Sequence, residues 1–123
     1  MDKKKILVID DMESQRLISC RMLEKLGYHV HTASSGEAAI DYLEKHSVDL
    51  VVLDMIMEPG INGRETYERI KKIHPSQKAV IVSGFAETDD VKATQELGAG
   101  HFIKKPFSFQ TLGMSVKNEL MKP

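Results

Sequence analysis

The sequence has little of several features that would assign it to whole classes of protein. Cys20 is the only cysteine among 123 residues, so no disulfide can form within the chain. The formal net charge of -1 gives no indication of the broad basic surface that nucleic-acid binding uses. No apolar run approaches the ~20 residues of a membrane span, and no secretory signal opens the chain. We therefore expect a cytoplasmic protein that binds neither nucleic acid nor membrane directly.

What remains is the composition of an ordinary globular domain. Hydrophobic residues make up 41% of the chain and charged residues 28%. A chain of this length buries about two thirds of the surface that its unfolded form exposes, so it needs no structural metal. We expect a single domain over residues 1–123.

Five short apolar runs alternate with five stretches of helical pattern. The runs cover residues 6–9, 28–33, 50–53, 79–82 and 102–103. The third and fourth runs are apolar on both faces, as are strands buried in a parallel sheet between two layers of helices. Right-handed crossovers between such strands give a (βα)5 doubly wound, three-layer α/β sandwich.

The helical stretches carry start and stop signals. Apolar residues recur every four positions from Ile18 to Leu26, and Gly27 follows them as a C-terminal stop. Ser34 and Glu37 have the spacing of a capping box that begins a second helix. Further helices are predicted over 64–73, over 87–97 and after a cap at Ser108, where Phe109, Leu112, Val116 and Leu120 share one face.

Chemically active residues stand where the predicted strands end. Open parallel sheets bind ligands beyond the carboxyl ends of their strands. There the sequence places Asp10 and Asp11, Asp54, Ser83 and Lys104-Lys105-Pro106. Three carboxylates repel one another unless a cation lies among them, and oxygen ligands of this kind suit Mg²⁺. A lysine can hold a phosphoryl group, and a carboxylate can attack phosphorus to form an acyl phosphate.

These motifs resemble those of the receiver domains of two-component response regulators. The matching motifs are Asp10-Asp11, Asp54, Ser83-Gly84 and Lys105-Pro106-Phe107, in the same order and at nearly the same spacing. The resemblance extends from Lys4 to about Leu120. It implies a flavodoxin-like sheet with strand order 2-1-3-4-5.

The resemblance also implies an acceptor and a metal site. Asp54 matches the phosphoacceptor. Asp10 and Asp11 match the acidic pair that binds Mg²⁺, Asp11 directly and Asp10 mainly through water. The backbone carbonyl of Ile56 matches the third protein ligand of the metal.

The remaining site residues correspond to a switch. Ser83 matches the hydroxyl that bonds the phosphoryl group, and Lys105 matches the phosphate-binding lysine. The peptide bond before Pro106 is cis in the family. Phe102 matches the aromatic residue that turns inward when the hydroxyl moves.

A receiver works with partners and catalyses no reaction beyond its own phosphorylation and dephosphorylation. The resemblance implies that a histidine kinase or phosphotransfer domain supplies the phosphoryl group. A downstream effector, or the chain's own parent protein, then reads the face formed by the fourth helix, fifth strand and fifth helix. Ile56 and Phe85 flank the acceptor with apolar bulk, so we expect slow self-hydrolysis.

The sequence departs from the family pattern in two places. Pro59 lies five residues after Asp54 where most receivers have four, so the loop is longer by one residue. Lys104 precedes Lys105, and Pro106 sets the register that selects Lys105. The loop over residues 55–60 resembles that of receivers fused to sensor histidine kinases. The sequence is compatible with three kinds of protein: a stand-alone regulator, a phosphorelay intermediate and a receiver excised from a longer chain.

Two other functions were weighed against the receiver. Phosphatases that form an aspartyl phosphate usually carry a second aspartate two residues after the first, where this chain has Ile56. A flavodoxin-like binding module requires a phosphate-cradling loop of serine, threonine and glycine after the first strand. Here that position reads Asp10-Asp11-Met12-Glu13. Both alternatives are therefore disfavoured.

Overall fold

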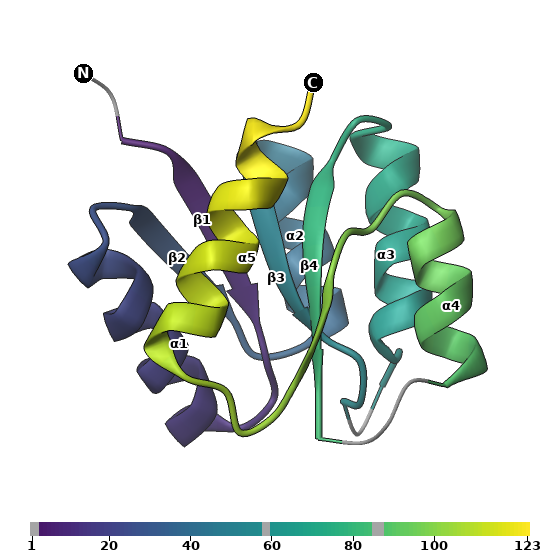
Figure 1. The fold of residues 1–123 in the computed structure, drawn as a ribbon. Coiled ribbons are helices and arrows are strands. Elements are labelled where there is room, and N and C mark those ends of the chain that lie inside the picture. The colour runs from purple at the N-terminus through teal and green to yellow at the C-terminus, as the bar shows by residue number, and fades with distance from the viewer. Residues whose placement is uncertain (1–2, 58–59, 85–87) are drawn as a thin grey trace.

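The computed structural model describes residues 3–57, 60–84 and 88–123. Within these ranges, five strands alternate with five helices (Figure 1). The strands are β1 (Lys5–Ile9), β2 (His29–Ala33), β3 (Leu50–Asp54), β4 (Lys78–Ser83) and β5 (Phe102–Lys104). The helices are α1 (Glu13–Lys25), α2 (Gly36–Lys45), α3 (Gly63–Ile73), α4 (Asp89–Glu96) and α5 (Phe109–Met121). The predicted start of the fourth helix at Glu87 lies outside the described residues.

The five strands form one parallel sheet in the order β2-β1-β3-β4-β5, which confirms the predicted topology. Ile9 at the end of β1 pairs with Leu53 of β3, and Leu53 pairs with Ile81 of β4. Because parallel strands point the same way, the residues after these three positions meet at one edge. That edge is where Asp10, Asp54 and Ser83 lie.

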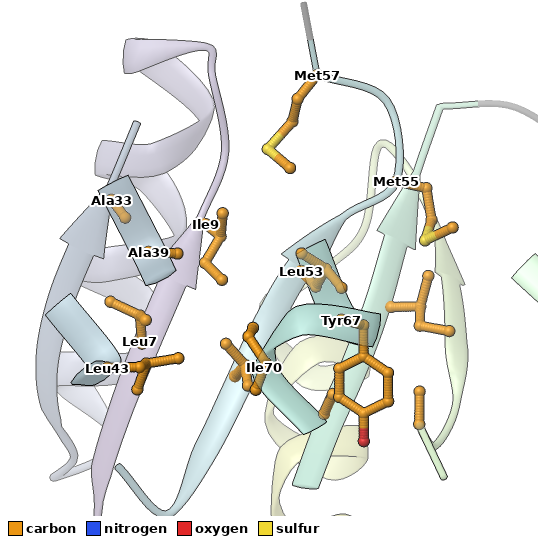
Figure 2. Packing of buried hydrophobic residues seen from close by; sticks show 14 of the residues in the cluster. Leu7, Ile9, Ala33, Ala39, Leu43, Leu53, Met55, Met57, Tyr67 and Ile70 are labelled. Carbon is orange, nitrogen blue, oxygen red and sulfur yellow. The ribbon is translucent and has the colours of Figure 1, made fainter. Parts of the chain in front are cut away.

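Helices cover both faces of the sheet, with α2, α3 and α4 on one and α1 and α5 on the other (Figure 1). Side chains of β1 alternate between the two resulting cores. Leu7 packs in the cluster that contains Tyr67 of α3 (Figure 2). Val8 packs with Leu23 of α1 and Leu112 of α5. Each large side chain buried in this way stabilises the fold by roughly 1.5–3 kcal/mol.

The cap of α2 differs from the prediction. Ser35, and not Ser34, precedes the helix, and its hydroxyl accepts a hydrogen bond from the Ala38 amide at 3.0 Å. Ser35 has the extended backbone that a capping residue needs, so the helix begins one residue later than a box from Ser34 requires. Glu37 then falls outside a capping-box position, and its carboxylate contacts the Ile61 amide instead. The predicted cap of α5 at Ser108 is confirmed.

The apolar spacing of α1 and α5 accounts for only part of what these helices bury, and each helix also buries a polar residue that the spacing does not predict. Ser19 and Leu23 of α1 are buried, whereas Ile18 is 46% exposed and Leu26 is 41% exposed. In α5, Glu119 is only 4% exposed and forms an ion pair with Lys122 at 3.0 Å. Ion pairing offsets the loss of hydration that burial imposes on this carboxylate.

The longest helices, α1 and α5, have 13 residues each. At a rise of about 1.5 Å per residue they extend for about 20 Å, whereas the apolar core of a bilayer is about 30 Å thick. In the described part of the chain, no helix combines the length and the apolar character needed to cross a membrane.

Candidate functional site

Three acidic side chains gather at the carboxyl edge of the sheet. Asp10 follows β1 directly, and Asp54 is the last residue of β3. One carboxylate oxygen from each of Asp10, Asp11 and Asp54 lies within 4.8 Å of the other two. Asp10 and Asp54 are both buried, so their charges interact through a medium less polar than water. The structure thus brings together the three carboxylates that the sequence predicted to meet.

Lys105 contributes the positive charge of this cluster. Its Nζ lies 2.8 Å from Asp10 Oδ2 and 3.6 Å from Asp54 Oδ1. The Lys105 side chain is only 16% exposed, whereas Lys104 is exposed to solvent. The Lys105 amide donates to the Ser83 carbonyl at 2.8 Å, and the Lys105–Pro106 peptide bond is cis. Of the two adjacent lysines, Lys105 is therefore the one that faces the carboxylates.

Asp10 is held from two sides. Its Oδ1 accepts a hydrogen bond from the Met12 amide at 3.0 Å, while its Oδ2 pairs with Lys105. Its backbone carbonyl accepts a bond from Arg16 Nη1 at 2.7 Å. The sequence gives no signal for this role of Arg16, because a lone charged residue near the start of a helix is usually solvated. The tertiary contact is what gives Arg16 a structural role at this edge.

The environment of Asp54 disfavours its ionised form. The pKa of Asp54 is raised to about 6 from its ordinary value of 3.8 by all its surroundings together, and burial is the largest cause. The charges of Asp10 and Asp11 also raise this pKa, while the Lys105 ammonium and the Ile56 amide lower it. One ammonium group does not neutralise three clustered carboxylates. The site therefore retains excess negative charge near neutral pH.

The donor set fits a small divalent cation. Hard ions such as Mg²⁺ bind through carboxylate and carbonyl oxygens, and they keep several waters. Oxygens from Asp10, Asp11 and Asp54 lie close enough together to surround one ion, and their mutual repulsion favours it. These residues therefore fit the predicted metal site, although the part proposed for the Ile56 carbonyl remains a prediction.

Gly63 packs directly against the backbone of the acceptor residue. Its amide donates a hydrogen bond to the Met55 carbonyl at 3.0 Å. A Cβ atom at this position would lie 2.6 Å from the Asp54 carbonyl oxygen and 2.6 Å from the Met55 Cα. Only glycine allows so close an approach between the start of α3 and the end of β3. In the sequence, Gly63 carries no signal of this contact, because the residues that it approaches are eight and nine positions earlier in the chain.

The predicted switch residues lie on the neighbouring strands β4 and β5. Ser83 ends β4 and is 2% exposed. Phe102 begins β5, is half-buried and packs against the core on the face covered by α2, α3 and α4. Two residues singled out in the sequence, Pro59 and Phe85, lie outside the described residues.

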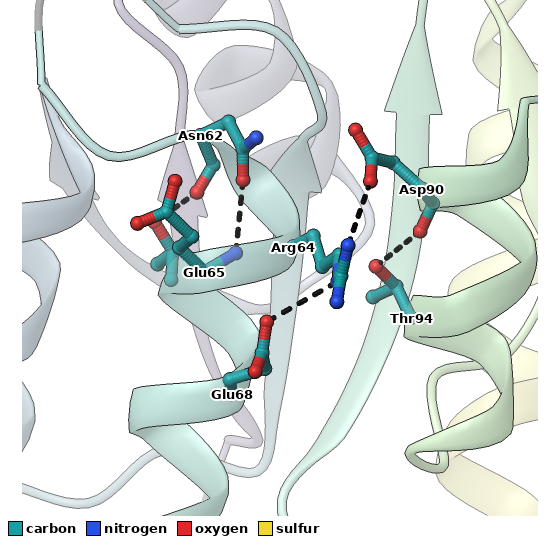
Figure 3. Close-up of polar contacts among 7 residues, drawn as sticks. Asn62, Arg64, Glu65, Glu68, Asp90 and Thr94 are labelled. Carbon is teal, nitrogen blue, oxygen red and sulfur yellow. Dashed lines mark hydrogen bonds and ion pairs between the residues drawn. The ribbon is translucent and has the colours of Figure 1, made fainter.

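A polar contact links α3 to the start of α4. Arg64 Nη1 lies 3.2 Å from Asp90 Oδ1, and Arg64 Nε lies 3.3 Å from Glu68 Oε1 (Figure 3). Asp90 in turn accepts a bond from the Thr94 hydroxyl through its carbonyl at 2.7 Å. The ion pairs are about half exposed, and pairs of this kind contribute less than ~1 kcal/mol. Of the two pairs, the one between Arg64 and Asp90 connects α3 to α4, and it contributes little to the stability of that contact.

Comparison with known proteins identifies relatives over almost the whole chain. The family model of the response regulator receiver domain matches residues 6–117. Sporulation initiation phosphotransferase F of Bacillus subtilis is 34% identical over 120 residues, which are 98% of this chain and 96% of that protein. A crystal structure of a CheY-like receiver domain protein from Methanospirillum hungatei is 27% identical, with a TM-score of 0.91. That match covers 97% of this chain and 94% of the other.

Other relatives are much longer than this chain. Sensor kinase CckA of Brucella abortus is 34% identical over 119 residues, which are 95% of this chain but 12% of the kinase. The chain spans between 46% and 50% of several transcriptional regulators that it matches. Similar sequences thus occur both as nearly complete proteins and as one part of larger ones.

Proposed function

The chain belongs to the response regulator receiver domain family of two-component systems, and from this premise we propose that Asp54 is its phosphoacceptor. The observation that supports this role best is the position of Asp54 between a lysine and two further carboxylates. Lys105, held against Asp10 and Asp54, is placed to bind a phosphoryl oxygen. The family match also leaves the phosphatase and the flavodoxin-like module without support.

The proposed reaction transfers a phosphoryl group from a phosphohistidine. An Asp54 carboxylate oxygen attacks phosphorus, an O–P bond forms, and the N–P bond breaks. The electron pair of that bond stays on the imidazole nitrogen of the donor, which takes a proton from solvent. Mg²⁺, when held by Asp11, Asp54 and the Ile56 carbonyl, supplies positive charge to the phosphoryl oxygens. Asp10 holds Lys105 in place through their ion pair and would contact a bound Mg²⁺ mainly through water.

The acyl phosphate would then act as a switch. Ser83 donates its hydroxyl hydrogen to a phosphoryl oxygen, and Phe102 turns into the space that this movement vacates. The face made of α4, β5 and α5 changes shape, and an effector or the parent chain reads it. Phosphorylation does this by favouring a conformer that already lies within a few kcal/mol. The exposed ion pair between Arg64 and Asp90 adds little to the packing that holds α4 in one position.

The proposal assigns the chain no enzymatic activity apart from gaining and losing its own phosphoryl group. Its partners would be a histidine kinase or phosphotransfer domain and an output partner in the cytoplasm, with no direct contact to nucleic acid. The similarity to a phosphotransferase and to a sensor kinase supports either a phosphorelay intermediate or the receiver of a hybrid kinase. We favour the hybrid kinase on the strength of the loop over residues 55–60.

Intact mass after incubation with acetyl phosphate tests the acceptor. The native chain should gain one phosphoryl group when Mg²⁺ is present and none when EDTA replaces it. Asp54→Asn should gain none, whereas Asp41→Asn, which alters an exposed aspartate of α2, should behave as the native chain does. A native chain that gains no mass from acetyl phosphate or from any phosphorylated kinase would refute the proposal.

The lifetime of the acyl phosphate should depend on Ile56. Its side chain is 45% exposed next to the acceptor, where it can shield phosphorus from water. Ile56→Asn should shorten the half-life by about threefold, because a polar side chain admits and orients water there. Intact mass followed over time after removal of acetyl phosphate measures this rate. Slower loss from the variant than from the native chain would contradict the prediction.

A further inference from the structure

The start of α2 is joined to the connection between β3 and α3 through Glu37. Glu37 Oε2 accepts a hydrogen bond from the Ile61 amide at 3.2 Å. Gly60 has φ +109°, and a Cβ atom there would lie 2.8 Å from each of the two Glu37 carboxylate oxygens. Ser35 already caps α2, so the Glu37 carboxylate is not needed for that task. The Glu37 carboxylate accepts its hydrogen bond from the connection that precedes α3.

The residues that follow Ile61 lie against the backbone of the acceptor. Two residues after Ile61, Gly63 begins α3 and lies against the backbone of Asp54 and Met55. Asn62 between them caps α3 by accepting a bond from the Glu65 amide at 2.9 Å (Figure 3). The segment from Ile61 to Gly63 therefore contacts Glu37 on one side and the acceptor backbone on the other.

We propose that Glu37 is a positioning residue for the phosphorylation site, holding the β3–α3 connection so that the Asp54 backbone and the Ile56 carbonyl keep the geometry needed for metal binding. This inference rests on the proposed function of Asp54. Glu37 touches neither the phosphoryl group nor the metal and acts through the Ile61 amide and Gly63.

The fold itself depends little on this contact. Buried side chains attach α2 to the core, among them Ala39 and Leu43, which share a cluster with Ile70 of α3. Glu37 is exposed, so its removal exposes no core surface and leaves no buried group unpaired. The loss should therefore appear in the site more than in global stability, because a mobile connection holds its carbonyl less well.

Four variants separate the hydrogen bond from the negative charge. Glu37→Ala removes both, and Glu37→Asp keeps the charge but is too short by one methylene to reach Ile61. Glu37→Gln keeps the reach and an acceptor oxygen while removing the charge. Glu44→Ala removes an exposed carboxylate elsewhere on α2 and serves as the matched control.

The first measurement is a Mg²⁺ titration in the absence of a phosphodonor. The NMR chemical shifts of the Asp54, Met55 and Gly63 amides report the binding. Glu37→Ala and Glu37→Asp should bind Mg²⁺ about fivefold more weakly, as expected for the loss of one hydrogen bond. Glu37→Gln and Glu44→Ala should stay within about twofold of the native chain. The second measurement is the rate at which each variant gains mass from acetyl phosphate, at low and at saturating Mg²⁺. This rate should fall in Glu37→Ala and Glu37→Asp. Thermal unfolding of each variant checks that the fold is kept.

Unchanged Mg²⁺ affinity and unchanged rates in Glu37→Ala would overturn the inference. A loss in Glu37→Gln with native behaviour in Glu37→Asp would also overturn it, because the negative charge near the start of α2 would then be responsible. If the native chain binds Mg²⁺ but accepts no phosphoryl group, the proposed function of Asp54 fails. The titration still decides the role of Glu37 in that case.

Discussion

Replacement of Lys105 by methionine should lower the free energy of unfolding by about 3 kcal/mol in the absence of Mg²⁺. Lys105 Nζ is the cation that the structure places beside Asp10 and Asp54, at 2.8 Å and 3.6 Å. Methionine preserves much of the side-chain volume but leaves the buried carboxylates without their counter-charge. Truncating one partner of a buried ion pair leaves the other charge uncompensated, and this accounts for the size of the effect. Urea unfolding at pH 8 in EDTA measures it.

The neighbouring lysine provides the matched control for this prediction. Lys104→Met changes the same residue type one position earlier, but that side chain is exposed, so its effect should stay below about 0.5 kcal/mol. Added Mg²⁺ should restore part of the stability that Lys105→Met has lost, because the ion supplies positive charge to the same carboxylates. Equal losses in the two variants would show that Lys105 is not the counter-ion of the cluster.

Asp54→Asn should be more stable than the native chain at pH 8 in EDTA, by up to about 3 kcal/mol. Burial, reinforced by the neighbouring carboxylates, raises the pKa of Asp54 in the folded chain to about 6, against an ordinary value of 3.8. Between these two pH values the folded chain retains a proton that the unfolded chain has lost. The contribution of Asp54 to the stability of the native chain therefore falls as pH rises from about 4 to about 6, and the full loss is present above that range. Asparagine does not ionise, so Asp54→Asn avoids this loss of stability.

Urea unfolding of the native chain and Asp54→Asn from pH 4 to pH 8 tests the sign as well as the size. The difference between the two should be small near pH 4 and should grow up to about pH 6. Asp41→Asn, at an exposed position of α2, should follow the native chain at every pH. A variant that is less stable than the native chain at pH 8 would show that Lys105 outweighs burial and the like charges. Saturating Mg²⁺ should reduce the difference, because the ion stabilises the ionised carboxylate.

The local sequence determined the elements of the fold and the edge that carries the site. Apolar runs such as those over residues 50–53 and 79–82 are too short for helices and have no polar face, so they fit only buried parallel strands. Once the strands are placed, Asp10, Asp54 and Lys105 must lie at the same edge of the sheet, because parallel strands end at one edge. The strand order came from the resemblance of these motifs to a known family, since periodicity does not specify which strands are neighbours.

Only the tertiary structure decided which polar side chains are partners. Glu37 has the spacing of a capping residue, yet its carboxylate binds the Ile61 amide, 24 residues away along the chain. Gly63 reads as a loop glycine, yet it packs on the acceptor backbone. Glu119 reads as a solvated charge, yet it is buried beside Lys122. Apolar periodicity records which face of an element is covered, whereas a polar side chain bonds to whatever group the packed fold brings within about 3 Å.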